Sequence, residues 1–192
     1  YGLDPLVNDA DKDADNDGLE YLQEASIKAG FPGVEIVGQG KGERIKGNFT
    51  LWTNYNVMPP MTRISEKHSF DELVKVNINA WYGSPEQPMI PVATQGWDRR
   101  PWEEPDGLGN GPTGKPLALT SWFFEKGTPE EFRKMLEEMV RWMDEHPEQT
   151  TKDRLAMIYA WNEIGEGGWL VPCKDDPDGE YLKAIRKVVF GK

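Results

Sequence analysis

The chain has 192 residues, of which 38% are hydrophobic and 29% charged, a balance typical of a soluble globular protein. No apolar run approaches the roughly 20 residues that a membrane-spanning helix needs, so no membrane partner is expected. The net charge of −11 would repel phosphate groups and therefore disfavours nucleic acid and anionic membranes as partners.

The first segment, residues 8–24, is acidic and rich in turn-forming residues. Residues 13–18 read Asp-Ala-Asp-Asn-Asp-Gly, and a glutamate follows at the spacing of a calcium-binding loop. The expected ligands are Asp13, Asp15, Asp17, the backbone of Leu19, and Glu24. The segment resembles thrombospondin type 3 and dockerin loops. The segment is expected either to bind a structural Ca²⁺ or to be a solvated acidic loop, and both interpretations remain open. Bound calcium would favour a secreted or periplasmic location.

Regular structure is expected to begin with a short helix over residues 19–29, followed by strands at 34–37 and 49–52. A glycine-rich loop separates the two strands. Ser69 is a suitable N-cap, and the apolar residues after it recur at helical spacing, so a helix is expected over residues 70–81. The run from 89 to 94 then predicts a strand that opens into a long loop.

The clearest helix begins at Thr128, because an N-cap, a proline in the first turn and a capping-box Glu131 coincide. Its expected inner face is Phe132, Met135, Leu136, Met139, Trp142 and Met143. Residues 155–160 predict a buried parallel strand. The last helix is expected to start after Gly179 and to stop at Gly191. Its expected inner face is Tyr181, Leu182, Ile185, Val188 and Val189.

Alternating strands and helices predict an α/β fold with a parallel sheet, either open or closed into a barrel. The polar loops each follow a strand, and such loops gather where barrel enzymes place their active sites, so a (β/α)8 TIM-type barrel is favoured. A complete barrel typically needs about 250 residues. We therefore expect residues 1–192 to form one domain, the C-terminal half of a barrel or an incomplete one, cut from a longer product. A second chain that completes the barrel is an expected partner.

The strand at 155–160 leads into an acidic loop at 161–168. Asn162, Glu163 and Glu166 lie there between Trp161 and Trp169. Two neighbouring carboxyl groups can titrate apart, so that one serves as a general acid while the other stays ionised. This predicts Glu163 and Glu166 as catalytic residues, against the alternative that they cap a turn or face water.

Residues 158–167 read Ile-Tyr-Ala-Trp-Asn-Glu-Ile-Gly-Glu-Gly, and Pro172 and the helix from 181 follow. Together with the segment from Pro91 to 98, they resemble the end of glycoside hydrolase family 99-like barrels, which are related to endo-α-mannosidases. The resemblance implies that Glu163 deprotonates the sugar 2-hydroxyl to form a 1,2-anhydro intermediate. It implies that Glu166 acts as general acid and then base. Expected substrate contacts are Trp97, Asp98, Trp161, Asn162 and Trp169.

The sequence thus predicts a retaining glycoside hydrolase that acts on an oligosaccharide or polysaccharide and uses no cofactor in catalysis. Two other hypotheses about the function of the chain remain open. One is a carbohydrate-binding module without activity, and the other is an inactive barrel fragment held together by calcium. The two histidines, His68 and His146, lack zinc-site spacing.

Overall fold

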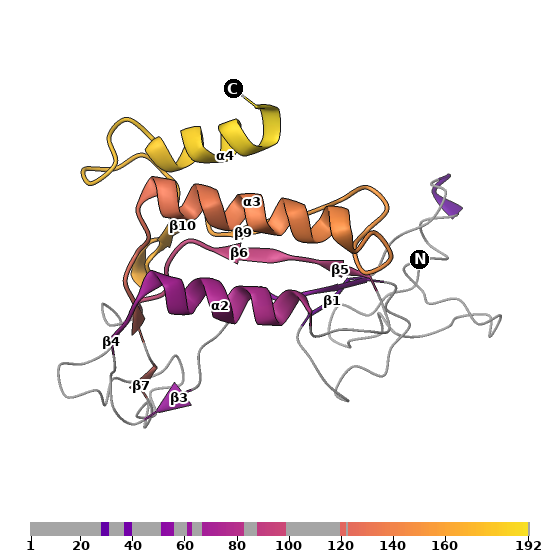
Figure 1. Ribbon diagram of the computed structural model, residues 1–192, viewed down its shortest axis with the longest axis horizontal. Helices are drawn as coiled ribbons and strands as arrows, with labels where there is room; N and C mark the ends of the chain where they lie inside the picture. Colours follow the sequence, from indigo (N-terminus) through magenta and orange to yellow (C-terminus); the bar gives the residue numbers. More distant parts are fainter. Residues whose placement is uncertain are drawn as a thin grey trace.

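The computed structural model describes residues 28–30, 37–39, 51–55, 61–62, 67–82, 88–98, 120–121 and 123–191. The strands are β1 (Val37–Gln39), β2 (Leu51–Thr53), β3 (Met61–Thr62), β4 (Lys67–His68), β5 (Met89–Ile90), β6 (Val92–Thr94), β7 (Thr120–Ser121), β8 (Phe123–Phe124), β9 (Met157–Tyr159), β10 (Asn162–Glu163) and β11 (Gly168–Trp169). The helices are α2 (Phe70–Trp81), α3 (Pro129–Glu145), the 3-10 turn η2 (Ile164–Glu166) and α4 (Glu180–Phe190). Helices α2, α3 and α4 lie side by side along one face of β5, β6 and β9 (Figure 1).

Helix α2 starts and ends where the sequence predicts. Ser69 and Glu72 form a capping box in which each side chain accepts a hydrogen bond from the other residue's backbone N–H. The helix is joined to β6 by two buried side chains. Asn77 accepts a hydrogen bond from the backbone of Thr94 at 3.1 Å, and Trp81 Nε1 donates to the backbone of Val92 at 2.9 Å. These polar contacts fix how the helix lies against the strand.

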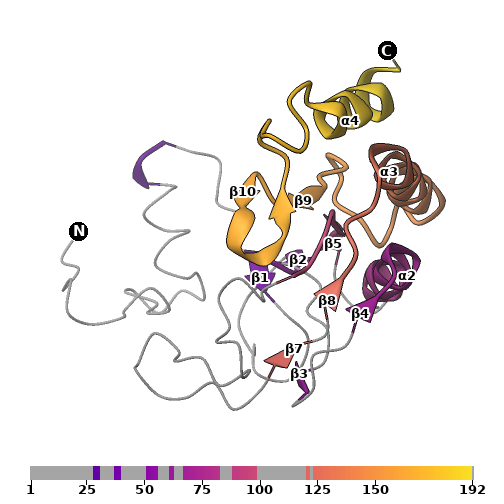
Figure 2. The same cartoon turned by 90° about the vertical axis from the view of Figure 1, so that its left-hand side faces the viewer.

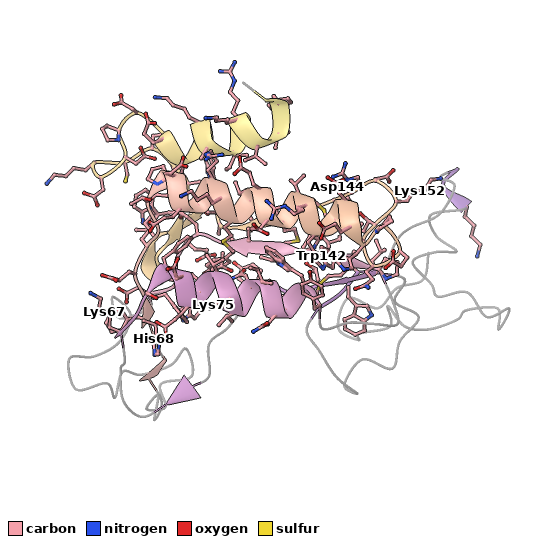
Figure 3. All side chains as sticks on the ribbon, in the orientation of Figure 1. Lys67, His68, Lys75, Trp142, Asp144 and Lys152 are labelled. Atoms are coloured by element: carbon pink, nitrogen blue, oxygen red, sulfur yellow. The ribbon has the colours of Figure 1, made fainter. Side chains whose placement is uncertain are left out.

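Helix α3 also confirms the sequence prediction. Its six expected core residues are all buried, and it packs against both β6 and α4. Trp142 lies where α3 meets α2, with its ring centroid 6.3 Å from that of Trp81 (Figure 3). The central core therefore comes from the helix faces that the apolar periodicity indicates.

The cap of α3 gives a first testable prediction. Glu131 accepts hydrogen bonds from the Thr128 backbone and hydroxyl, and these bonds hold the pKa of Glu131 below its usual value. Thr128→Ala is expected to lower the free energy of unfolding by about 1 kcal/mol in urea denaturation at pH 7. Because a lowered pKa stabilises the fold only above the unfolded value of about 4.3, the difference should narrow as the pH falls below about 4.

The matched control is Lys152→Ala, at an exposed position outside the helices. It should leave the free energy of unfolding within about 0.5 kcal/mol of the parent, as ordinary surface substitutions do. Equal stability of Thr128→Ala and the parent at pH 7 would contradict the role of the cap.

The pairings of β1 with β2, β2 with β5, β6 with β9, and β4 with β8 are parallel, whereas those of β3 with β7 and β10 with β11 are antiparallel. On one side of Met89 lies Trp52 of β2, and on the other side lies Thr150, shortly before β9. The strands β1, β2, β5 and β9 thus follow one another in space in chain order, with α2 and α3 on one face (Figure 2). Among the described residues these strands form short separate sheets, without a closed ring.

Three details differ from the expectations. The strand predicted at 89–94 is interrupted between β5 and β6 by Pro91, which has no N–H to give to a ladder. The strand predicted at 155–160 is shorter and less buried, since Leu155 is 49% and Met157 36% exposed. Val189 was expected on the inner face of α4 but is 62% exposed. A helix turns about 100° per residue, which places Val189 on the expected face, about 80° from Tyr181, but in the last turn of α4, directly before the helix ends.

Candidate functional site

The candidate site lies where the parallel strands end. Strand β9 leads into the hairpin of β10 and β11, with η2 between them, and β6 leads into residues 95–98. Tyr55 follows β2 in the same way. Figure 2 faces the side of the molecule on which the hairpin lies next to β9. Because the carboxyl ends of parallel strands meet at one edge of a sheet, residues far apart in the chain come together here.

Glu163 and Glu166 lie at the two ends of the 3-10 turn, because Glu163 is its N-cap and Glu166 its last residue. Both glutamates are half-buried. Glu163 accepts a hydrogen bond from the Tyr55 hydroxyl at 2.8 Å, and Glu166 accepts one from the Tyr159 hydroxyl. Each carboxyl group is therefore held by its own tyrosine.

The two tyrosines also contact each other. Their rings meet edge to face, with centroids 5.4 Å apart. The hydrogen bond to Glu163 raises the pKa of Tyr55, and partial burial and the negative charges of Glu163 and Glu166 raise it further. Tyr55 therefore remains protonated at neutral pH and keeps donating its proton to the carboxylate.

The sequence did not single out Tyr55 or Tyr159 as site residues. Tyr159 was visible only as part of the strand before the acidic loop, and its burial looks like ordinary core packing. Tyr55 lies 108 positions from Glu163 in the chain. The one feature of the sequence that could have indicated Tyr55 is its position just after a predicted strand, because the other polar loops also begin just after strands.

The loop at 95–98 is attached to the hairpin through the backbone. Asp98 N–H donates to the Glu166 carbonyl at 2.7 Å. The Gln95 side chain accepts a hydrogen bond from Trp169 N–H at 3.0 Å. Gly96 touches the Gly167 carbonyl so closely that a Cβ at Gly96 would lie 2.7 Å from that oxygen. We call residues 95–98 and 161–170 the paired loops, because each fixes the position of the other.

The five predicted substrate-contacting residues have different surroundings. Trp97 is 2% exposed and packs against the Tyr159 ring, whereas Trp161 is 55% exposed and presents an open ring. Asn162 is exposed and Asp98 is half-buried. One face of the half-buried Trp169 is covered by the Lys126 ammonium group. Trp161 is therefore the best stacking surface of the three tryptophans, and substrate contact by all five stays a prediction.

A cavity of about 410 Å³ lies beside the paired loops. Its lining includes Trp97 and Asp98 from one loop and Gly167 and Trp169 from the other, with Lys126 from the segment after β8. Its size is within the roughly 300–1,000 Å³ range of small-molecule sites. The cavity thus adjoins the glutamate turn through Gly167, the residue that follows Glu166.

The expected calcium ligands Asp13, Asp15, Asp17, Leu19 and Glu24 lie outside the described residues, so calcium binding stays a prediction. Within the part of the chain that the structure describes, no group of three or more His, Cys, Asp or Glu side chains is placed to hold a metal ion. None of the described helices combines the length and the apolar character needed to cross a membrane.

Comparison with known proteins gives one match. The model of a protein family described as Glycosyltransferase WbsX matches residues 42–185. This range contains both glutamates, their tyrosine partners and the paired loops. No curated protein and no solved structure matches the chain.

Proposed function

The chain belongs to the WbsX glycosyltransferase family, and from this premise we propose that it is a retaining glycoside hydrolase with Glu163 and Glu166 as its acid–base pair. The substrate is an oligosaccharide or a polysaccharide. The observation that supports this most directly is the pair of hydrogen bonds from Tyr55 to Glu163 and from Tyr159 to Glu166. Such bonds hold two carboxyl groups in defined orientations next to a cavity, which is what acid–base catalysis requires.

In the proposed mechanism the two glutamates have different roles. Glu163 removes the proton from the 2-hydroxyl of the sugar, and that oxygen attacks C1 while the bond from C1 to the leaving oxygen breaks. Glu166 gives its proton to the leaving oxygen. Glu166 then takes a proton from a water molecule, and the water oxygen attacks C1 and opens the 1,2-anhydro ring. Glu163 returns to the 2-oxygen the proton that it took in the first step. Two displacements at C1 retain the configuration.

The donor role of Tyr55 supports this assignment. The hydroxyl donates to one carboxyl oxygen of Glu163 at 2.8 Å and so fixes the orientation in which this carboxyl group would meet a substrate. Among the described residues, the other carboxyl oxygen of Glu163 accepts no hydrogen bond and so is free to face a substrate hydroxyl.

We also propose that the described strands form an arc of a (β/α)8 barrel. Two features support the arc: β1, β2, β5 and β9 follow chain order through parallel pairings, and α2, α3 and α4 cover a single face. In an open doubly wound sheet, helices cover both faces. Leu155 and Met157 are exposed in this arc, as expected of residues that the rest of a barrel, or a second chain, would cover.

A second candidate function is glycosyl transfer. It is favoured by the description of the matching family, and it uses the same bond-breaking step. The difference lies in the acceptor, because a sugar hydroxyl would then take the place of water. A carbohydrate-binding module without activity is the remaining alternative, and the exposed Trp161 would serve it equally well.

The deciding experiment is to incubate the protein with a panel of α- and β-linked oligosaccharides, with and without an added acceptor sugar. Products are followed by mass spectrometry and by proton NMR of the anomeric signal. Release of a sugar with retained configuration supports hydrolysis, and a longer product made only with acceptor supports transfer. Binding without any product would overturn both reactions in favour of a binding module.

Tyr55 gives a further prediction. Tyr55→Phe removes the hydroxyl that holds Glu163 but keeps the ring against Tyr159, so kcat is expected to fall about 10- to 100-fold, the equivalent of one hydrogen bond to a charged group. The control is Tyr82→Phe, at another exposed tyrosine that lies away from the glutamates. It should leave kcat unchanged. Equal kcat values for Tyr55→Phe and the parent would remove Tyr55 from the site.

A further inference from the structure

Lys126 has an unusual position for a lysine. Its Nζ lies over the Trp169 ring and 4.2 Å from the centroid of the Tyr181 ring. The Nζ atom is buried, and it has no hydrogen-bond acceptor among the described residues. Burying an ammonium group without a hydrogen-bonded partner is costly, and the aromatic faces compensate for only part of that cost. The amine therefore retains an unused capacity to donate.

A second unpaired donor belongs to another residue of the same cavity lining. Trp97 is 98% buried, and its indole Nε1 has no acceptor among the described residues. Buried indole N–H groups are usually hydrogen-bonded, so an unpaired one calls for an explanation. Trp97 and Lys126 both line the cavity beside the paired loops. Two buried donors without acceptors on one cavity indicate a ligand that brings an oxygen acceptor.

The charges around the cavity limit the charge of the acceptor group that it can bind. Lys67 is the first residue of β4 (Figure 3), and its ammonium group is paired with Glu125 at 2.6 Å. Lys126 therefore supplies the one positive charge of the lining that forms no ion pair among the described residues. Asp98 adds a negative side chain to the same lining. One available cation beside an aspartate favours a singly charged carboxylate over a doubly charged phosphate group.

We propose that this cavity is a subsite for the carboxylate of an acidic sugar residue, a uronic acid, with Lys126 and Trp97 as the donors. The proposal rests on the function proposed above and defines its substrate class. The cavity adjoins the glutamate turn at Gly167, so the subsite would hold a sugar next to the bond that is cleaved. Phe123 and Phe124 supply apolar lining for the ring.

The protonation of Lys126 agrees with this subsite. Burial lowers the pKa of Lys126 to about 7, against the opposing attraction of Cys173 and Asp176. A carboxylate bound beside the amine would favour the charged form again. Binding of a carboxylate would thus raise the fraction of Lys126 that carries its positive charge.

The test is isothermal titration calorimetry with a tetragalacturonide and with its uncharged methyl ester, at pH 6.5. The parent is expected to bind the acid at least about tenfold more tightly than the ester, the effect of one charged hydrogen bond. Lys126→Met should reduce binding of the acid to the level of the ester and leave the ester unchanged. Lys126→Arg should keep most of the preference for the acid over the ester, and Trp97→Phe should reduce this preference. The matched control is Lys67→Met, at the salt-bridged lysine, and it should bind the acid and the ester as the parent does.

Each outcome decides the proposal. Equal binding of acid and ester by the parent, no binding of either, or an equal loss of both in Lys126→Met overturns the carboxylate subsite. Tighter binding of glucose 1-phosphate than of glucuronate would assign the cavity to phosphate instead. Thermal unfolding of each variant separates lost binding from lost fold. Repeating the titration with Glu163→Gln, which is expected to bind but not to cleave, measures the preference without turnover. A preference for the acid in this variant supports the subsite even where the parent cleaves neither substrate, so the two proposals can fail separately.

Discussion

Glu166→Gln is expected to slow cleavage of an unactivated glycoside by about 10²–10⁴-fold, the usual contribution of general acid–base catalysis. Glutamine has nearly the same shape and its oxygen can still accept the Tyr159 hydrogen bond, but it cannot give a proton to the leaving oxygen. The fold and the binding of substrate should therefore be preserved. The measurement is kcat/KM with an oligosaccharide, together with a thermal unfolding curve.

Activated substrates make this test specific to the role of Glu166. A dinitrophenyl leaving group needs no proton, so Glu166→Gln should cleave such a glycoside much closer to the parental rate than it cleaves the oligosaccharide. Glu163→Gln should be impaired on both substrates, because the base is needed with any leaving group. Glu148→Gln, at an exposed position between α3 and β9, is the control. Equal defects of Glu166→Gln on both substrates would remove the general-acid assignment.

The second large effect is expected from Gly96→Ala. The added Cβ would lie 2.7 Å from the Gly167 carbonyl oxygen, closer than side chains approach backbone atoms. The neighbouring atoms belong to the backbone of a hairpin that is also held by Asp98 N–H, so they cannot turn aside as a side chain would. The free energy of unfolding should fall by about 1–3 kcal/mol, as in other overpacked sites. The position of Glu166 should change with it, so catalysis should be lost more completely than stability.

Gly191→Ala provides the comparison. Gly191 ends α4 in a left-handed conformation with nothing within 4 Å of its Cβ position, so alanine there meets backbone strain but no clash. Its loss of stability should be smaller, about 1 kcal/mol, and its kcat should be unchanged. Urea denaturation and kcat, measured on both variants, check the contrast. A stable and fully active Gly96→Ala protein would show that the paired loops are not in close contact.

Local signals made the helices predictable. Thr128, Glu131 and the apolar stripe of α3 lie within one stretch of chain, and each of them indicates the same helix. The same holds for Ser69 and Glu72 at α2. Where burial depends on distant elements, the prediction was weaker: Met157 continues an apolar run, yet it is exposed because burial of a strand depends on what lies beside it.

The site was predictable in part for the same reason. Glu163 and Glu166 share a loop, so the sequence itself suggests that they act together, and in the structure each accepts a hydrogen bond from one of two tyrosines whose rings are in contact. Tyr55 and Lys126 reach the same region from other strands, and no spacing in the chain links them to the glutamates. Such partners become visible only when the strand ends meet in space.

The close contact of Gly96 with Gly167 has a consequence for protein engineering. Loops at the ends of parallel strands are usually treated as independent parts that can be exchanged one at a time to change specificity. Here a transplanted hairpin would meet a foreign neighbour at the Gly96 contact and would lose the hydrogen bond from Asp98 N–H. Chimeras and combinatorial libraries built on this scaffold should therefore transfer residues 95–98 and 161–170 as one cassette.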